Sequence, residues 1–232
     1  MLPPHSWGGR PPAQRAAGWG EPITLSTMDD LGKATEDQVI LAWLQAEIES
    51  PEFQAYLVGN PPNPANLSVA LKAARSPDLH DGAQNELRRQ IITSVYGFGQ
   101  SAGSFQGLGA DIGWRRFRLS TDEVGELLYA RQGAAWPILA PATRKVAEGA
   151  TNVGHVFTGD STNMVVLSLA SGLCHSDKKV PEIIALRRPD GHLVILEGHA
   201  RATAIVLEAH RFPNGVQAYV GDGPSVANWP YL

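Results

Sequence analysis

Residues 193–203 of the chain read Leu-Val-Ile-Leu-Glu-Gly-His-Ala-Arg-Ala-Thr. The first four residues are a continuous apolar run, which is typical of a buried β-strand. A helical pattern follows from Ala200 to His210, and its small residues would let the helix pack closely on the sheet. The stretch therefore predicts a strand, a tight turn at residues 197–199 and a helix.

A turn of this kind can bind an anion. The first backbone N–H groups of a helix have no partner within the helix, and the helix dipole adds partial positive charge there. Gly198 lets a ligand approach the backbone, while His199 and Arg201 add donors. We expect this turn to hold a phosphate-bearing ligand. The same residues also fit a plain turn in which His199 caps the helix and Arg201 is solvated.

The rest of the last third fits a small α/β arrangement. Pro and Gly residues, such as Pro189 and Gly191, separate its apolar runs. The predicted elements are a helix that is capped by Thr162 or Asn163 and stopped by Gly172, strands at residues 183–186, 192–196 and 216–220, and the helix at 200–210.

The first half of the chain has a different, helical pattern. Thr35 and Gln38 have the spacing of a capping box, and so do Ser120 and Glu123. Helices are predicted from residue 35 to 48, over 53–58, 67–74 and 83–96, and from residue 120. Residues 97–113 hold many glycines but lack the strand and helix that a dinucleotide fingerprint needs, so we interpret them as a loop.

Composition limits the classes of function. The 232 residues are 43% hydrophobic and 18% charged, which is ordinary for a globular protein. A net charge of −4 argues against binding to nucleic acid by charge alone. The densest basic cluster, residues 114–118, reads Trp-Arg-Arg-Phe-Arg and fits either a nucleic-acid contact or a surface strand with arginines that extend to solvent.

We expect a cytoplasmic protein without a membrane segment. The single cysteine, Cys174, cannot form an intramolecular disulfide, which fits a reducing compartment. The chain shows no signal-peptide pattern and no run of about 18 apolar residues.

Residues 194–204 resemble the signature of the ParB/sulfiredoxin-like superfamily. In that signature a strand leads through an acidic or small residue, a Gly and a His or Glu to an Arg at the start of a helix. Residues 180–186 resemble the family's preceding strand, and the resemblance covers roughly residues 150–222. The fold that we predict is α+β, with a helical N-terminal half packed on a small ParB/sulfiredoxin-like domain that contains a mixed sheet. Its parts are an extended arm at residues 1–30, a helical region at 31–135 and the α/β domain at 136–232, the last two forming one compact unit.

The resemblance implies several functions. Members of the ParB/sulfiredoxin-like superfamily include partition proteins that bind DNA and use CTP, and sulfiredoxins that use ATP to repair an over-oxidised cysteine. Other members are kinases of free serine and nucleases. Across them the turn binds nucleotide phosphates, so Gly198, His199, Arg201 and Thr203 are expected to do so here. Cys174 lies far from the turn, which argues against repair, and no helix-turn-helix segment follows the last predicted strand.

Small-molecule kinases of this fold pair the acidic residue of the turn with a second, upstream carboxylate. Glu197 matches the first of these carboxylates. Asp160, Asp177 and Glu182 are the candidates for the second, and Asp177 lies beside a histidine, His175.

We therefore predict a nucleotide-dependent phosphotransferase that acts on a small hydroxylated metabolite such as an amino acid. It would use ATP or another nucleotide together with Mg²⁺, with Glu197 and His199 as catalytic residues and Glu197 as the metal ligand. The alternatives are a ParB-like nucleotide- or DNA-binding module and a ParB-like nuclease. The predicted partner is a small-molecule substrate rather than nucleic acid.

Overall fold

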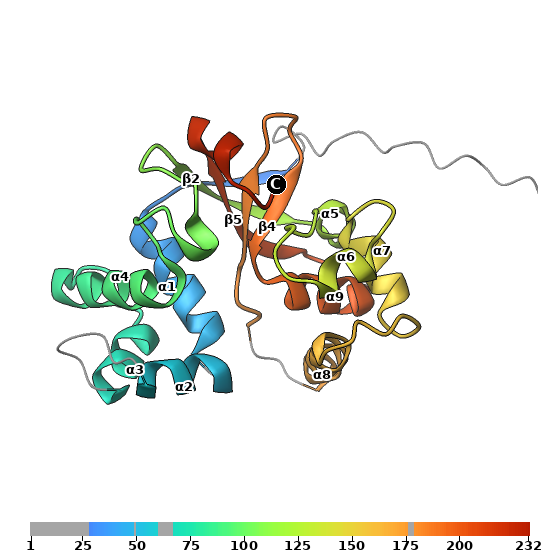
Figure 1. Cartoon of the computed structure of the whole chain (residues 1–232), viewed down its shortest axis with the longest axis horizontal. Coiled ribbons are helices and arrows are strands. Elements are labelled where there is room, and N and C mark those ends of the chain that lie inside the picture. Colours follow the sequence, from blue (N-terminus) through green and yellow to red (C-terminus); the bar gives the residue numbers. More distant parts are fainter. Residues whose placement is uncertain (1–27, 49, 60–66, 176–178) are drawn as a thin grey trace, which may run out of the picture.

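The computed structural model describes residues 28–48, 50–59, 67–175 and 179–232, and these form a mixed five-stranded sheet with helices on both faces (Figure 1). The strand order is β1-β2-β5-β3-β4. The strands are β1 (Asp29–Ala34), β2 (Gly113–Leu119), β3 (Ile183–Arg187), β4 (Leu193–Glu197) and β5 (Val216–Asp222). Strands β3 and β5 are parallel, and the other neighbouring pairs are antiparallel. The predicted α+β class with a mixed sheet is confirmed.

The helices divide between the two faces of the sheet. Figure 1 shows α1 to α4 on one side and α5 to α9 on the other. Their bounds are α1 (Glu36–Glu47), α2 (Pro51–Gly59), α3 (Leu67–Arg75), α4 (Gly82–Tyr96), α5 (Thr121–Glu126), α6 (Ala135–Leu139), α7 (Val146–Asn152), α8 (Thr162–Cys174) and α9 (His199–Leu207).

Local signals explain where several helices begin. Thr35 caps α1 and Ser120 caps α5, and both predicted capping boxes are formed. The predicted ends of α8 are wrong, because its N-cap is Ser161 instead of Thr162 or Asn163 and the helix continues past Gly172 to Cys174. Glycine is tolerated inside a helix at a modest cost, so one glycine near the end of an apolar helix is a weak stop signal.

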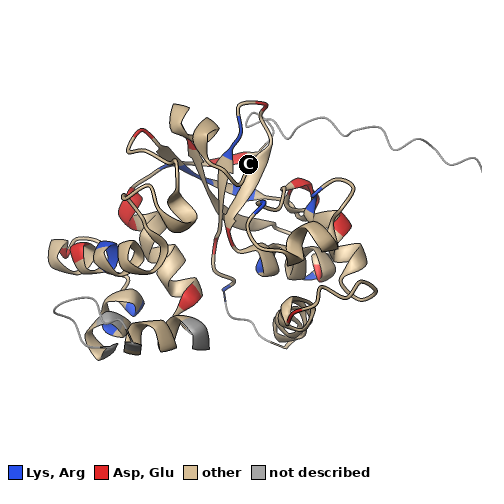
Figure 2. Cartoon of the chain, in the orientation of Figure 1, with Lys and Arg blue, Asp and Glu red and all other residues tan. Residues whose placement is uncertain are grey.

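Strands β1 and β2 lie in the part of the chain that we predicted to be an arm and a helical region. Strand β1 has no apolar alternation because it is an exposed edge strand. Ion pairs to β2 stabilise it instead: Asp29 binds Arg118 at 3.0 Å, and Asp30 binds Arg115. The basic cluster at residues 114–118 is thus a strand whose three arginines are each paired with an acid. Figure 2 marks the Lys and Arg residues in blue and the Asp and Glu residues in red.

Each face of the sheet has its own buried apolar cluster. Trp43 and Ile92, from α1 and α4, pack with Ile184 and Tyr219 on one face. The other face packs against α5, α7 and α9. Within the described ranges, no helix is both long and apolar enough to cross a membrane.

Candidate functional site

The predicted turn is a corner between β4 and α9. Strand β4 ends at Glu197, helix α9 begins at His199, and Gly198 between them has a φ of 99°. A side chain is strained in this left-handed conformation. A Cβ at this position would also lie 2.8 Å from Nη1 of Arg201. The corner is therefore confirmed, but the Arg201 side chain fills the space beside Gly198 that we expected to be open.

Arg201 is anchored rather than solvated. Its Nη1 donates to Glu182 O at 2.9 Å and to Glu197 Oε2 at 3.2 Å, while Nη2 donates to Glu197 Oε1 at 3.4 Å. The side chains of Arg201 and Glu197 are only 12% and 11% exposed. The structure thus contradicts the alternative of a solvated arginine, and the positive charge at this corner already has a carboxylate partner.

Glu47, the last residue of α1, brings a second carboxyl group to Glu197. The two carboxyl groups lie close enough for their charges to interact, and Tyr96 Oη donates to Glu47 Oε2 at 2.9 Å. Burial, followed by the negative charge of Glu197, raises the pKa of Glu47 to about 7. Two carboxylates close together cannot easily both be ionised, which favours the protonated form of Glu47. We refer to Glu47 and Glu197 as the carboxyl pair.

A buried donor without a partner lies near the carboxyl pair. Trp43 is one helical turn before Glu47, and its ring centroid is 5.0 Å from that of Tyr96. Only 2% of Trp43 is exposed, and its Nε1 has no hydrogen-bond partner among the described residues. Buried polar groups are nearly always paired. The indole N–H is thus a buried donor beside Tyr96, enclosed by the apolar cluster on this face of the sheet.

Of the three upstream carboxylates proposed from the sequence, the two that the structure describes bind partners other than Glu197. Asp160 accepts hydrogen bonds from Thr158 and Thr162 in the turn before α8. The Glu182 carboxylate binds Arg116 and Lys179, although its carbonyl accepts from Arg201. Asp177 lies outside the described residues.

Sequence reasoning missed Glu47, although two signals marked it. An acidic residue at the C-terminus of a helix opposes the helix dipole, which is unfavourable without a compensating role. Glu47 also follows Trp43 by four residues, so it lies on the same helix face as a core residue.

His199 lies on the other side of the corner, in a stack of aromatic rings. Its ring centroid is 5.2 Å from that of Trp136 and 6.2 Å from that of Tyr129. Nε2 accepts a hydrogen bond from Ala130 N at 3.3 Å, which assigns the ring proton to Nδ1. Burial lowers the pKa of His199 to about 3, so the ring is neutral near pH 7 and adds no positive charge for a phosphate.

Thr203 belongs to the same stack. Its hydroxyl donates to His199 O at 2.8 Å and accepts from Tyr129 Oη at 2.7 Å, and the residue is fully buried. The side chains of His199 and Thr203 are thus engaged within the protein. The structure brings Glu197, Gly198 and Arg201 together with Glu47 and places these two side chains elsewhere.

The carboxyl pair has the right chemistry for Mg²⁺, although it is small. No cluster of three or more His, Cys, Asp or Glu side chains suited to a metal occurs in the part of the chain that the structure describes. Mg²⁺ in phosphoryl-transfer sites is bound by one or two carboxylates plus substrate phosphates and water. Glu197 fits such a site, in which substrate phosphates and water would complete the coordination of the ion.

No family model, curated protein or solved structure matches the chain. The resemblance to the ParB/sulfiredoxin-like superfamily therefore remains a prediction from the sequence of the corner.

Proposed function

We propose that the chain is a nucleotide-dependent phosphotransferase that acts on a small hydroxylated metabolite such as an amino acid. The observation that supports this function is the carboxyl pair at the start of α9. Phosphoryl transfer requires a group that orients or deprotonates the acceptor hydroxyl and donors that hold the phosphates. Glu47 and Glu197 offer the first, while Gly198, Arg201 and the N-terminus of α9 offer the second.

Glu47 is the better candidate for the general base. A carboxyl group with a pKa of about 7 is partly ionised at neutral pH and accepts a proton more readily than an ordinary carboxylate does. The acceptor hydroxyl would give its proton to Glu47 as its oxygen bonds to the terminal phosphorus of the nucleotide. The bond from that phosphorus to the bridging oxygen would break, and the nucleoside diphosphate would leave. Tyr96, through its hydrogen bond, would keep the Glu47 carboxyl oriented.

Glu197 and Arg201 would serve the donor. Glu197 is the residue that would hold Mg²⁺ together with phosphate oxygens, and the ion would supply neutralisation of phosphate charge. Arg201 already lies against the backbone at Gly198, so its guanidinium needs only a small shift to bind a phosphate that reaches the N-terminus of α9.

Activity can be tested directly on the purified protein. ATP, CTP and GTP with Mg²⁺ are incubated with amino acids and amino alcohols, and transfer of the terminal phosphate is measured. We expect Glu47→Gln to lower kcat by roughly a hundredfold or more, because the base is lost. Glu36→Gln is the matched control, since Glu36 lies at the other end of α1 and pairs with Arg89. Unchanged turnover in a folded Glu47→Gln protein, or cleavage of DNA in place of transfer, would contradict the proposal.

Nucleotide binding gives a second, independent measurement. Arg201→Ala should weaken nucleotide affinity about tenfold or more, which is the value of one charge-assisted hydrogen bond. Arg115→Ala is the control, because Arg115 is paired with Asp30 on the exposed edge of the sheet. Equal losses at a fixed salt concentration would place the binding surface on β2. A loss at Arg115 alone, with binding to single-stranded DNA, would favour the nucleic-acid alternative.

A further inference from the structure

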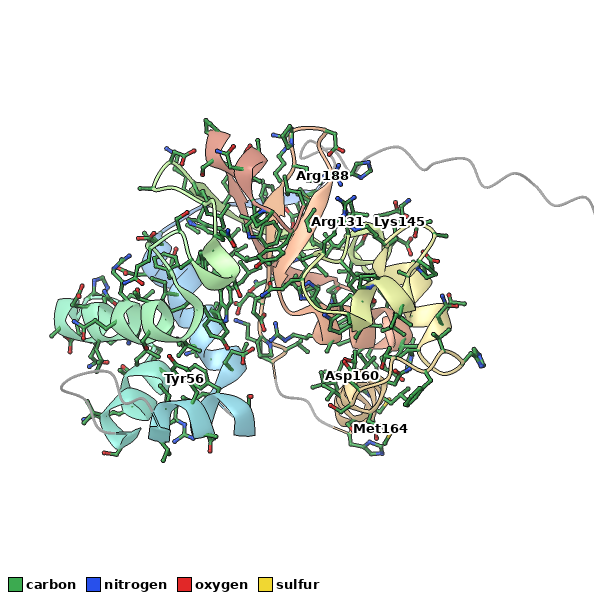
Figure 3. All side chains as sticks on the ribbon, in the orientation of Figure 1. Tyr56, Arg131, Lys145, Asp160, Met164 and Arg188 are labelled. Atoms are coloured by element: carbon green, nitrogen blue, oxygen red, sulfur yellow. The ribbon has the colours of Figure 1, made fainter. Side chains whose placement is uncertain are left out.

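Three arginines lie on segments that pair with β4, pair with one another or begin the turn between β3 and β4. Arg188 begins that turn, Arg131 follows the segment that pairs with β4, and Arg144 precedes α7. Figure 3 shows Arg131 and Arg188 on the same side of the molecule, next to this turn. We call Arg131, Arg144 and Arg188 the arginine cluster.

Backbone pairing holds these segments together. Leu128 bridges both Lys145 and Val194, so the segment that leads to Arg131 lies between the other two. Tyr129 N donates to Arg144 O at 2.8 Å. The backbone at Arg144 and the segment that leads to Arg131 are therefore fixed next to each other and next to β4.

Arg144 is held in a fixed position. Its Nε and Nη2 both donate to Tyr129 O, at 3.2 and 2.6 Å, and its backbone has a φ of 63°. Burial, with the nearby charges of Arg131 and Arg188, lowers its pKa to about 10. Like charges this close destabilise one another unless an anion neutralises them.

The charges of the cluster are poorly balanced. Arg188 pairs with Asp190 at 2.8 Å, but no ion pair joins Arg131 or Arg144 to a carboxylate among the described residues. Other cations of the sheet region do have acidic partners: Arg115, Arg116, Arg118, Lys145 and Arg187. Two positive charges are thus in excess at one place on a chain whose net charge is −4.

We propose that the arginine cluster binds a small ligand that carries two or more linked phosphate groups. Planar guanidinium groups match phosphate oxygens in pairs, and a diphosphate would balance the excess charge. The arginines of β2 are paired with acids, so the described residues offer no continuous basic path for a nucleic acid. This site is separate from the carboxyl pair and does not depend on phosphoryl transfer.

Calorimetric titration with inorganic pyrophosphate at fixed salt tests the proposal. Arg131→Ala and Arg188→Ala should each weaken binding about tenfold, whereas Arg118→Ala, at an arginine paired with Asp29, should not. Arg144 is left intact because its guanidinium holds the backbone of Tyr129. Full pyrophosphate affinity in both cluster variants, or an equal loss in Arg118→Ala, would overturn the proposal.

Two further titrations identify the source of the phosphates and separate this site from the corner. If ATP affinity falls with pyrophosphate affinity in the cluster variants, the ligand is a nucleotide; if ATP affinity is unchanged, it is a free oligophosphate. The Arg201→Ala substitution removes the guanidinium that would bind phosphate at the start of α9. The effect of Arg131→Ala on pyrophosphate affinity is then measured again in this Arg201→Ala protein. A cluster effect that persists there supports the site even if the protein has no transferase activity, and one that disappears contradicts it.

Discussion

The corner between β4 and α9 presents two sides that differ sharply. On one side Glu197 and Arg201 face Glu47. On the other side His199 and Thr203 pack with Tyr129. Burial disfavours the charged form on both sides, so it raises the pKa of a carboxyl group on the first and lowers that of an imidazole on the second. In the sequence, residues 197–203 look like a single anion site. In the structure, Glu197 and Arg201 belong to the carboxyl pair and its surroundings, whereas His199 and Thr203 belong to a neutral aromatic core.

The largest effect on stability is expected when the aromatic stack around His199 is disrupted. His199→Ala removes a stacked ring and leaves the N–H of Ala130 without its acceptor. We expect the free energy of unfolding to fall by about 3–5 kcal/mol, as measured by urea denaturation. His155→Ala, at an exposed position, is the control and should cost less than about 0.5 kcal/mol. Loss of transferase activity without loss of stability would instead make His199 a catalytic residue.

The next effect concerns the carboxyl pair and depends on pH. The pKa of Glu47 is higher in the folded state, at about 7, than the ordinary value of 4.5. Its contribution to stability is therefore complete below pH 4.5 and is lost as the pH rises through 7. Relative to Glu47→Gln, the wild-type protein should lose up to about 3 kcal/mol over this interval. Urea denaturation at several pH values measures the free energy of unfolding, and Glu36→Gln is the control. If this free energy depends on pH in the same way for the wild type and for Glu47→Gln, the pKa of Glu47 is not raised.

The smallest effect compares one tyrosine from each side. Tyr129→Phe loses the hydrogen bond to Thr203 and should cost about 1 kcal/mol of stability, without changing the pH profile of activity. Tyr96→Phe loses the hydrogen bond to Glu47 and should shift that profile. Kinetics at several pH values distinguish the two variants, and a shift with Tyr129→Phe would show that the two sides are coupled.

Local signals in the sequence predicted the corner and the helix starts. A continuous apolar run before a glycine predicts a strand and a turn from neighbouring residues alone. The capping box at Thr35 predicts a helix start in the same way, without information on distant contacts. Glu47 was missed as the second carboxylate because its role depends on where the end of α1 meets β4, about 150 residues later in the chain. Strand β1 was missed because cross-strand ion pairs, and not an apolar face, mark it.

The position of β5 has a consequence for how the protein folds. It is the last strand in the chain, yet it pairs with both β2 and β3 at the centre of the sheet. The strand pair β1–β2 is joined to the strand pair β3–β4 within the sheet only through β5, residues 216–222, which lies between them. During synthesis the first 215 residues would therefore expose two unpaired strand edges, at β2 and at β3. We expect the chain to complete its sheet late and slowly, and to be most vulnerable to aggregation just before that step.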